Sequence, residues 1–163
     1  MGAGKTTVGR LLAARLSLPF VDTDHEIERR TGVSVSTIFE IEGEHGFRRR
    51  ESAMLSELLG GGPVVLATGG GAVLKPENRQ LIRENAQLVA YISADPKVLF
   101  DRTRHDRTRP LLQVADPLKR LRELHSERDP LYREVANMVV DGNRSNAKQI
   151  VELLEQELQK CSE

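Results

Sequence analysis

Several residue types are scarce in this sequence, and each shortage excludes a class of function. The chain contains no tryptophan, and aromatic residues make up 4% of it. Nucleic-acid partners are therefore not expected, because proteins that bind single strands stack the bases on aromatic side chains. The 24 basic and 24 acidic residues cancel, so no net positive field attracts a polyanion or an anionic membrane. Any anion must be recognised by arginines that cluster locally.

Cysteine and long apolar runs are also scarce. The single cysteine, Cys161, cannot form a disulfide within the chain, which is typical of a reducing compartment. No apolar run approaches the roughly 18 residues that cross a membrane, and no signal-peptide pattern is present. The length of 163 residues and the hydrophobic content of 39% are typical of one domain. We therefore expect a cytoplasmic, monomeric, single-domain protein without a membrane partner.

The first seven residues, MGAGKTT, contain the second half of the phosphate-binding pattern G-x-x-x-x-G-K-[ST]. An apolar helical period from Thr6 to Leu16 begins where the helix N-terminus that receives the phosphates should lie. In such a loop, backbone N–H groups bind the phosphates, the lysine neutralises their outer oxygens and the next hydroxyl ligates Mg²⁺. The pattern predicts these ATP-binding residues: Gly2, Ala3, Gly4, Lys5, Thr6 and Thr7.

The phosphate-binding pattern is incomplete, because its first glycine would fall about two positions before Met1. The strand that precedes such a loop would lie further upstream. We expect either a start roughly ten residues earlier, which we favour, or a chain that folds without this strand. Each backbone group left unpaired in its absence costs roughly 1–3 kcal/mol. The sequence as given is therefore predicted to express poorly or to lack activity.

Two acidic residues follow the expected strand Phe20–Val21, where the sequence reads Asp22-Thr23-Asp24. Side chains just past the carboxyl ends of parallel strands line the ligand crevice, so both carboxylates are expected to face the phosphates. The alternative is a helix cap ahead of Glu26–Arg30, and Asp24 could serve both purposes. Beside a phosphate loop, the functional interpretation is favoured.

A basic run, FRRRE, covers residues 47–51 in an expected helix. Arg48 and Glu51 lie about one turn apart and share a helix face. The carboxylate can therefore hold the planar guanidinium in place for a substrate that carries a carboxylate. Arg49 and Arg50 are expected to lie on a solvated surface.

Two further segments are candidates for contact with ligands. Gly69, Gly70 and Gly71 follow the expected strand 64–68, where bare backbone lets a ligand approach closely; a flexible linker is the alternative. The segment 102–109 holds four arginines and His105. It is typical of a mobile flap that closes over a polyphosphate, and an exposed basic loop is the alternative. His105 has no suitably spaced partner for a metal site.

Strands expected at residues 20–21, 64–68, 87–93 and 138–141 alternate with helices along the chain. This alternation predicts a parallel, three-layer α/β domain. We expect a short helix at 34–41, a separate longer one from about 43, and a break near Pro130 in the helix that starts at Asp116.

The ordered motifs GAGKTT, DTD, FRRRE, GGGA, RTRPLL and RDPLY resemble those of the shikimate kinases, which are P-loop kinases of the nucleoside monophosphate kinase type. The likeness covers essentially the whole chain. It implies transfer of the ATP γ-phosphoryl group to the 3-hydroxyl of shikimate, on the route to chorismate and aromatic amino acids. It also implies strand order 2-3-1-4-5 with the first strand absent here, a shikimate-binding region at about 22–60 and a mobile lid at about 102–115, all in a single domain, 1–163.

The resemblance assigns roles to the phosphate loop and the acid pair by matching motif. Lys5 and the backbone of Gly2–Thr7 would bind the ATP phosphates. Thr6 would ligate Mg²⁺, with Asp22 assisting through water. Asp24 would accept a hydrogen bond from the substrate hydroxyls and act as a base or orienting group.

The resemblance also assigns the substrate-binding residues. Arg48 and Arg128 would bind the shikimate carboxylate, Glu51 would hold Arg48, and the glycines around Gly70 would contact the ring.

For the nucleotide, Arg109 in the lid would reach the transferring phosphoryl group, whereas Arg102 and the turn Arg144-Ser145 would flank the adenine. Two alternatives remain open at this point. One is a relative such as gluconate kinase, which shares the loop and lid. The other is a nucleotide- or shikimate-binding module without turnover.

Overall fold

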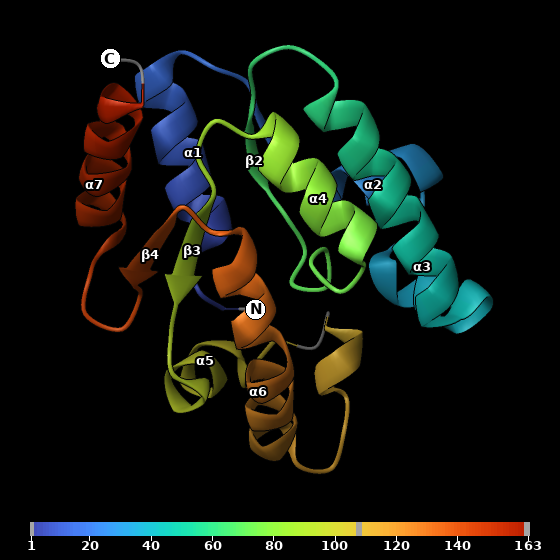
Figure 1. Ribbon diagram of the computed structural model, residues 1–163. Coiled ribbons are helices and arrows are strands. Elements are labelled where there is room, and N and C mark those ends of the chain that lie inside the picture. Colours follow the sequence, from blue (N-terminus) through green and yellow to red (C-terminus); the bar gives the residue numbers. More distant parts are fainter. Residues whose placement is uncertain (1, 107–108, 162–163) are drawn as a thin grey trace.

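The computed structural model describes residues 2–106 and 109–161, and in them helices and short strands alternate (Figure 1). In chain order the elements are α1 (Lys5–Leu16), β1 (Phe20–Asp22), α2 (Thr23–Thr31), α3 (Val35–Leu59), β2 (Val65–Ala67), α4 (Pro76–Asn85), β3 (Ala90–Ser93), α5 (Pro96–Thr103), the 3₁₀ helix η1 (Pro110–Leu112), α6 (Pro117–Val135), β4 (Met138–Asp141) and α7 (Ala147–Lys160). The predicted α/β alternation is confirmed. Within the described ranges, no helix is long and apolar enough to cross a membrane.

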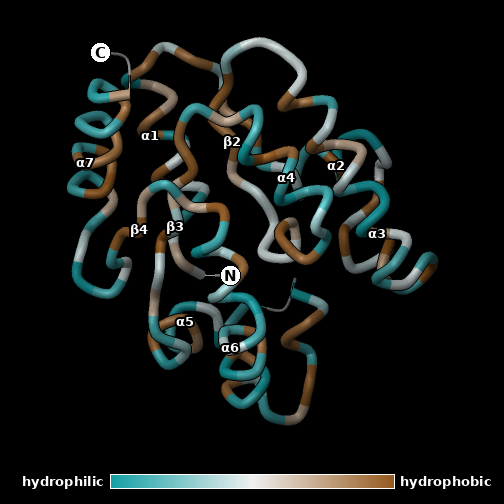
Figure 2. Tube along the Cα trace, in the orientation of Figure 1, coloured by the Kyte–Doolittle hydropathy of each residue, from teal (hydrophilic) through white to brown (hydrophobic). Residues whose placement is uncertain are grey.

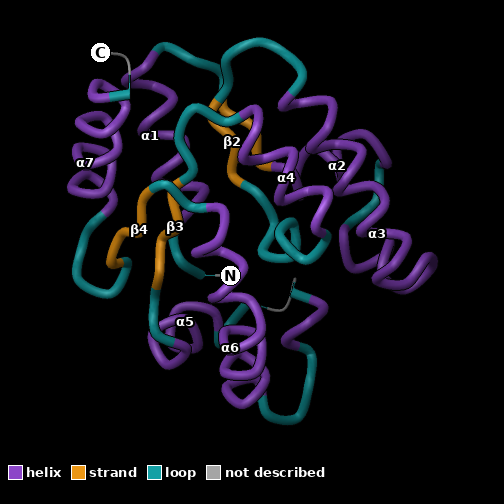
Figure 3. The backbone as a smooth tube through the Cα atoms, viewed as in Figure 1, coloured by secondary structure: helices purple, strands orange, loops and turns teal. Residues whose placement is uncertain are grey.

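The strands form two separate parallel pairs, which are drawn in orange in Figure 3. In the first pair Phe20 lies opposite Val65, so β1 and β2 run side by side in register. In the second pair Ala90 lies opposite Met138, which places β4 beside β3. This arrangement is the order expected from the resemblance when its first strand is left out.

A cavity of about 1260 Å³ lies between the two strand pairs. Its lining includes residues 64–70, which contain β2, and residues 87–92, which contain most of β3. Leu12 of α1 also lines it, as do Ala3 and Lys5. Because both neighbouring strands face this cavity, each has an edge there without a neighbouring strand among the described residues.

Apolar clusters pack the helices onto the strands. Val8 of α1, Ile92 of β3, Val140 of β4 and Val151 of α7 belong to one buried cluster. The hydrophobic side of α7 is turned toward α1 (Figure 2). Burial of each such side chain stabilises the fold by about 1.5–3 kcal/mol, so this cluster fixes α1 and the loop ahead of it.

A second cluster joins α2 to α3 through Ile27, Ile38, Phe47 and Met54. It fixes the helix that starts directly after β1 against the helix that carries the basic run. The acid pair and Arg48 are thereby held on one rigid body.

One predicted helix boundary is confirmed and one differs from the structure. The helices expected at 34–41 and from about 43 are separated at Gly43, where the backbone (φ 68°, ψ 178°) is not helical. Both lie within α3, one on each side of this kink, and glycine tolerates the positive φ. The break expected near Pro130 is wrong, because α6 continues through it. Pro130 is exposed, and the surrounding helix is held by buried residues on both sides of it, including Arg128 and Val135. The loss of one backbone hydrogen bond is therefore tolerated there.

Candidate active site

The loop before α1 has the backbone that the phosphate-binding pattern predicts. Gly2 and Gly4 both have left-handed φ angles, of 70° and 89°. At Gly2 a Cβ would lie 2.7 Å from Cγ2 of Thr103, so a side chain is excluded by contact as well as by conformation. Gly4 is the N-cap of α1, and the first N–H groups of a helix have no partner within it. Lys5, Thr6 and Thr7 form the first turn of this helix, where an anion is stabilised.

Asp22 joins the start of α1 to the end of β1. The hydroxyl of Thr6 donates to Oδ2 of Asp22 over 2.8 Å. The other carboxylate oxygen accepts from the backbone N–H of Asp24 over 3.1 Å and so caps α2. Sequence reasoning considered Asp24 for this cap; the structure gives the cap to Asp22 and leaves the side chain of Asp24 for another role.

Asp24 and Lys5 form the charged centre of the site. Burial and the charge of Asp22 raise the pKa of Asp24, whereas the charges of Lys5 and Arg48 lower it. Burial lowers the pKa of Lys5; Asp24 opposes this shift and the charge of Arg109 adds to it. Oδ1 of Asp24 is buried and has no hydrogen-bond partner within the described residues, although it can accept two.

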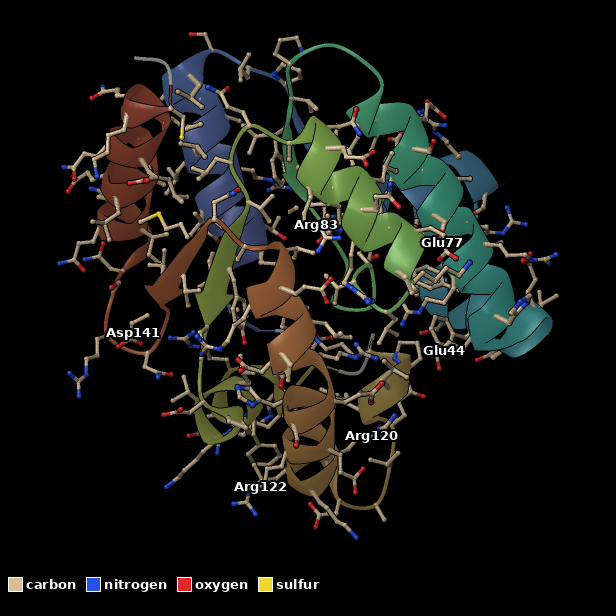
Figure 4. All side chains as sticks on the ribbon, in the orientation of Figure 1. Glu44, Glu77, Arg83, Arg120, Arg122 and Asp141 are labelled. Carbon is tan, nitrogen blue, oxygen red and sulfur yellow. The ribbon has the colours of Figure 1, made fainter. Side chains whose placement is uncertain are left out.

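Arg48 is held by two carboxylates from its own helix. Its Nη1 donates to Oε2 of Glu51 over 2.8 Å, and its Nη2 donates to Oε1 of Glu44 over 3.0 Å. Figure 4 labels Glu44 on α3, the helix that contacts η1. Burial raises the pKa of Glu51, and the charge of Arg48 lowers it. The predicted pairing of Arg48 with Glu51 is confirmed.

Arg128 of α6 is the second buried arginine of the site, with 5% of its surface exposed. Its Nε has no hydrogen-bond partner within the described part of the chain, and its charge lowers the pKa of Glu51. A buried charged donor without a partner is costly, so this position suits an anionic ligand. Arg48 and Arg128 therefore bring two guanidinium groups to the same buried carboxylate from different helices.

The glycine segment after β2, Gly69–Gly71, packs directly against the charged side chains of the site. A Cβ at Gly69 would lie 2.7 Å from Oε1 of Glu51 and 2.8 Å from Oδ1 of Asp24, and one at Gly71 would overlap the guanidinium of Arg48. The segment is therefore glycine because charged side chains lie against its backbone. Four hydrogen bonds tie it to its surroundings: Gly69 N–H to Thr23 Oγ1, Tyr132 Oη to Gly70 O, Ala72 N–H to Gly69 O, and Leu74 N–H to Gly71 O. The predicted alternative, a flexible linker, does not describe it.

The phosphate loop, the acid pair and two convergent arginines occupy one site, and a family model described as shikimate kinase matches residues 1–159. The chain belongs to the shikimate kinase family. It is therefore an ATP-dependent phosphotransferase of aromatic amino acid biosynthesis, as the sequence predicts.

Curated shikimate kinases are similar to it over nearly the whole chain. That of Dechloromonas aromatica is 61% identical over 94% of this chain and 84% of the relative. That of Aromatoleum aromaticum is 57% identical over 98% of this chain and 90% of the relative.

Solved structures confirm the fold. The shikimate kinase of Acinetobacter baumannii in complex with shikimate is 46% identical, with a TM-score of 0.94 over 98% of this chain and 89% of that one. The shikimate kinase of Aquifex aeolicus is 32% identical, with a TM-score of 0.84 over 98% of this chain and 92% of that one.

The remaining residues that the shikimate kinase resemblance singled out lie in α5 and in the turn after β4. Arg102 donates to the backbone oxygen of Gly142 over 3.0 Å and to that of Gly2 over 3.4 Å, so it ties the loop to the turn after β4. Arg144 lies exposed on that turn, and the backbone N–H of Ser145 donates to Asp141 O over 3.3 Å. Asp141 itself is labelled beside the end of β4 in Figure 4.

The expected lid is described in part, because residues 107 and 108 lie outside the described ranges. Within it, Nε of Arg109 donates to Oδ2 of Asp106 over 2.7 Å. The electrostatic influence of Arg109 on Lys5 indicates that it lies near the phosphate loop. Among the described residues, no group of three or more histidine, cysteine, aspartate or glutamate side chains is arranged to hold a metal ion.

Sequence reasoning missed three residues that shape this site: Thr23, Glu44 and Tyr132. Thr23 and Tyr132 stand inside the motifs DTD and RDPLY, so their positions were marked but their partners were not. Glu44 lies about one helical turn before Arg48, and this spacing could have identified it.

Proposed function

We propose that this chain transfers the γ-phosphoryl group of ATP to the 3-hydroxyl of shikimate, giving shikimate 3-phosphate and ADP. The observation that supports the proposal is electrostatic: the charges of Arg48 and Arg128 both act on the buried Glu51, and those of Arg48 and Lys5 both act on Asp24. A cyclic acid bound by two arginines would present a hydroxyl to Asp24 beside the phosphate loop. The relative solved in complex with shikimate supports this substrate.

The two arginines and the glycine segment would fix the substrate ring. Guanidinium groups bind carboxylates through paired, charge-assisted hydrogen bonds. Glu51 and Glu44 already occupy part of the Arg48 fork, so its free donors have one defined direction. The backbone of Gly69, Gly70 and Gly71 leaves room for the ring where side chains would not. This rigid positioning supplies much of the catalysis in phosphoryl transfer.

Asp24 would orient the attacking hydroxyl and take its proton. Its unpartnered Oδ1 can accept the hydrogen bond from the 3-hydroxyl, and the proton moves to this oxygen as the new P–O bond forms. The charge of Lys5 opposes the effect of burial and helps to keep Asp24 ionised. The loose transition state of phosphoryl transfer requires little basicity, so Asp24 acts mainly by position.

Lys5 and the N–H groups from Gly2 to Thr7 would bind the ATP phosphates. Thr6 and Asp22 offer neighbouring oxygen atoms, which is the donor chemistry that Mg²⁺ prefers, so these residues fit a magnesium ion. When bound, Mg²⁺ neutralises charge on the phosphate oxygens. Arg109 would stabilise the charge of the transferring group, in the role of a late-arriving arginine.

The rest of the proposal concerns the nucleotide base and the organisation of the chain. Arg102 and the turn Arg144-Ser145 would flank the adenine, which is supported by the hydrogen bond from Arg102 to that turn. We propose one domain over residues 1–163, with a shikimate-binding region at about 22–60 and a lid at about 102–115. We further propose a monomer that acts in the cytoplasm.

A coupled assay with ATP and Mg²⁺ tests this function. Turnover with shikimate and not with gluconate is expected. Turnover with gluconate and not with shikimate would assign a gluconate kinase activity to the chain. Shikimate binding without ADP release would identify a binding module, and it would remove the catalytic roles of Lys5 and Asp24.

A further inference from the structure

The segment Gly69–Gly71 is fitted closely against the charged groups of the site. A side chain at Gly69 would meet both Glu51 and Asp24, and one at Gly71 would overlap Arg48. Because the backbone itself lies against the carboxylates and the guanidinium, a small displacement of this segment changes the space left for the substrate. Its position must therefore be fixed.

Two side chains from other elements fix this backbone at adjacent residues. Oγ1 of Thr23, at the start of α2, accepts from the N–H of Gly69 over 3.1 Å. Oη of Tyr132, in α6, donates to the carbonyl oxygen of Gly70 over 2.6 Å. Thr23 is fully buried, so no water competes for its hydroxyl. We call this pair of hydrogen bonds the glycine clamp.

Each clamp residue shares an element with a residue of the proposed site. Thr23 directly precedes Asp24, and Tyr132 follows Arg128 by one turn of α6. The glycine clamp thus links α2, which carries Asp24, to the backbone at Gly69. It links α6, which carries Arg128, to the adjacent residue Gly70. A change in either hydrogen bond alters the distance between the two ends of the substrate pocket.

The Tyr132 hydroxyl can be separated from the packing of its ring. The ring lies 4.9 Å from that of Tyr91, centroid to centroid, and this contact remains when the hydroxyl is removed. Burial raises the pKa of Tyr132. The charge of Arg128 and a hydrogen bond between Arg128 and the Tyr132 hydroxyl lower this pKa, but the net shift is upward. The phenol therefore stays protonated and can donate a hydrogen bond. Tyr91 offers a matched comparison, because its own hydroxyl donates to Oδ1 of Asp129 over 2.9 Å, away from the glycines.

We propose that Thr23 and Tyr132 are positioning residues that set the affinity for shikimate by holding Gly69 and Gly70 against Asp24 and the two arginines. The inference rests on the proposed function for the identity of the ligand. A merely structural role would change stability without changing affinity.

The test compares Tyr132→Phe with Tyr91→Phe, and Thr23→Val with Thr31→Val. Thr31 lies on the same helix as Thr23, and its hydroxyl donates to Ile27 O over 2.9 Å, within that helix. We expect Tyr132→Phe and Thr23→Val to raise the KM for shikimate by about 3- to 10-fold each, the usual effect of one lost hydrogen bond. The KM for ATP and kcat should change by less than about twofold. Thr23→Ser, which keeps the hydroxyl, should restore the affinity.

The double variant tests whether the two residues act on the same backbone. Its effect on shikimate affinity should be smaller than the product of the single effects, because the first loss already frees the segment. Unchanged shikimate KM in both single variants, or an equal rise in Tyr91→Phe, overturns the inference. So does a parallel rise in the KM for ATP.

Calorimetric titration of shikimate without ATP separates this inference from the proposed function. Tighter binding by wild type than by the two variants supports the clamp even if no turnover occurs, and in that case only the catalytic proposal fails. Equal binding by all of them with normal turnover overturns the clamp alone. No binding by wild type overturns both.

Discussion

Arg48 donates to Glu51 over 2.8 Å, and the Glu51 side chain is completely buried. Such a pair costs desolvation energy on both sides, so its contribution to stability is small or negative when compared with apolar residues. The pair instead fixes the orientation of the Arg48 guanidinium, because this group cannot rotate away from the pocket while Glu51 is ionised. The Glu51 carboxylate therefore serves to orient Arg48 for binding more than to stabilise the core.

Replacing this carboxylate should weaken both the fold and the binding of shikimate. Glu51→Gln leaves the buried Arg48 without its nearest negative charge, and loss of one partner of a buried pair costs about 3–5 kcal/mol. We expect a fall of this order in the free energy of unfolding by urea, and a higher KM for shikimate. Glu42→Gln is the control, because Glu42 pairs with Arg50 on the exposed side of the same helix. Equal effects of the two substitutions would contradict the proposed role.

Replacing the orienting carboxylate should stop turnover and leave nucleotide binding intact. Asp24→Asn keeps the shape of the side chain but removes the acceptor that takes the proton, so kcat should fall by about 100-fold or more. The Kd for ATP, measured by titration calorimetry, should stay within about twofold. Asp101→Asn, at an exposed position of α5, serves as the control. A variant at position 24 with wild-type kcat would remove Asp24 from its role.

The raised pKa of Asp24 predicts how the stability of the protein depends on pH. Because burial raises the pKa of Asp24 above its ordinary value of 3.8, the folded state binds this proton more tightly than the unfolded state does. The stabilising effect of protonation is complete below the unfolded pKa and is lost as pH rises through the folded pKa. Wild type should therefore lose stability relative to Asp24→Asn over this interval, as measured by urea unfolding at a series of pH values. A pH-independent difference would contradict the raised pKa.

The acid side of the activity profile should report the same group. Turnover requires the ionised carboxylate, so kcat should fall with decreasing pH at a midpoint above 3.8. Activity and stability should therefore change in opposite directions with pH. Protonated Asp24 stabilises the fold but cannot accept the proton of the substrate hydroxyl. A midpoint at or below the ordinary value would indicate that Lys5 and Arg48 outweigh burial.

Local patterns in the sequence predicted much of the fold. The helix that begins after Gly4, the strand that ends in Asp22 and the pairing of Arg48 with Glu51 depend on residues within about one helical turn of each other. Periodicity, capping and one-turn spacing act over such distances, so they can be recognised without knowledge of the rest of the chain. The resemblance of the ordered motifs then predicted the family, which the comparisons confirm.

The tertiary structure decided which atoms meet in the site. Gly69 and Thr23 are separated by 46 positions, and Gly70 and Tyr132 by 62, yet each pair shares a hydrogen bond. No local pattern links them, because their approach depends on how α2 and α6 pack around the end of β2. The continuation of α6 through Pro130 has a similar origin, since packing on both sides outweighs a local preference. Short-range chemistry thus determined which residue types the site contains, and long-range packing determined their contacts, because apolar burial acts on whole helices.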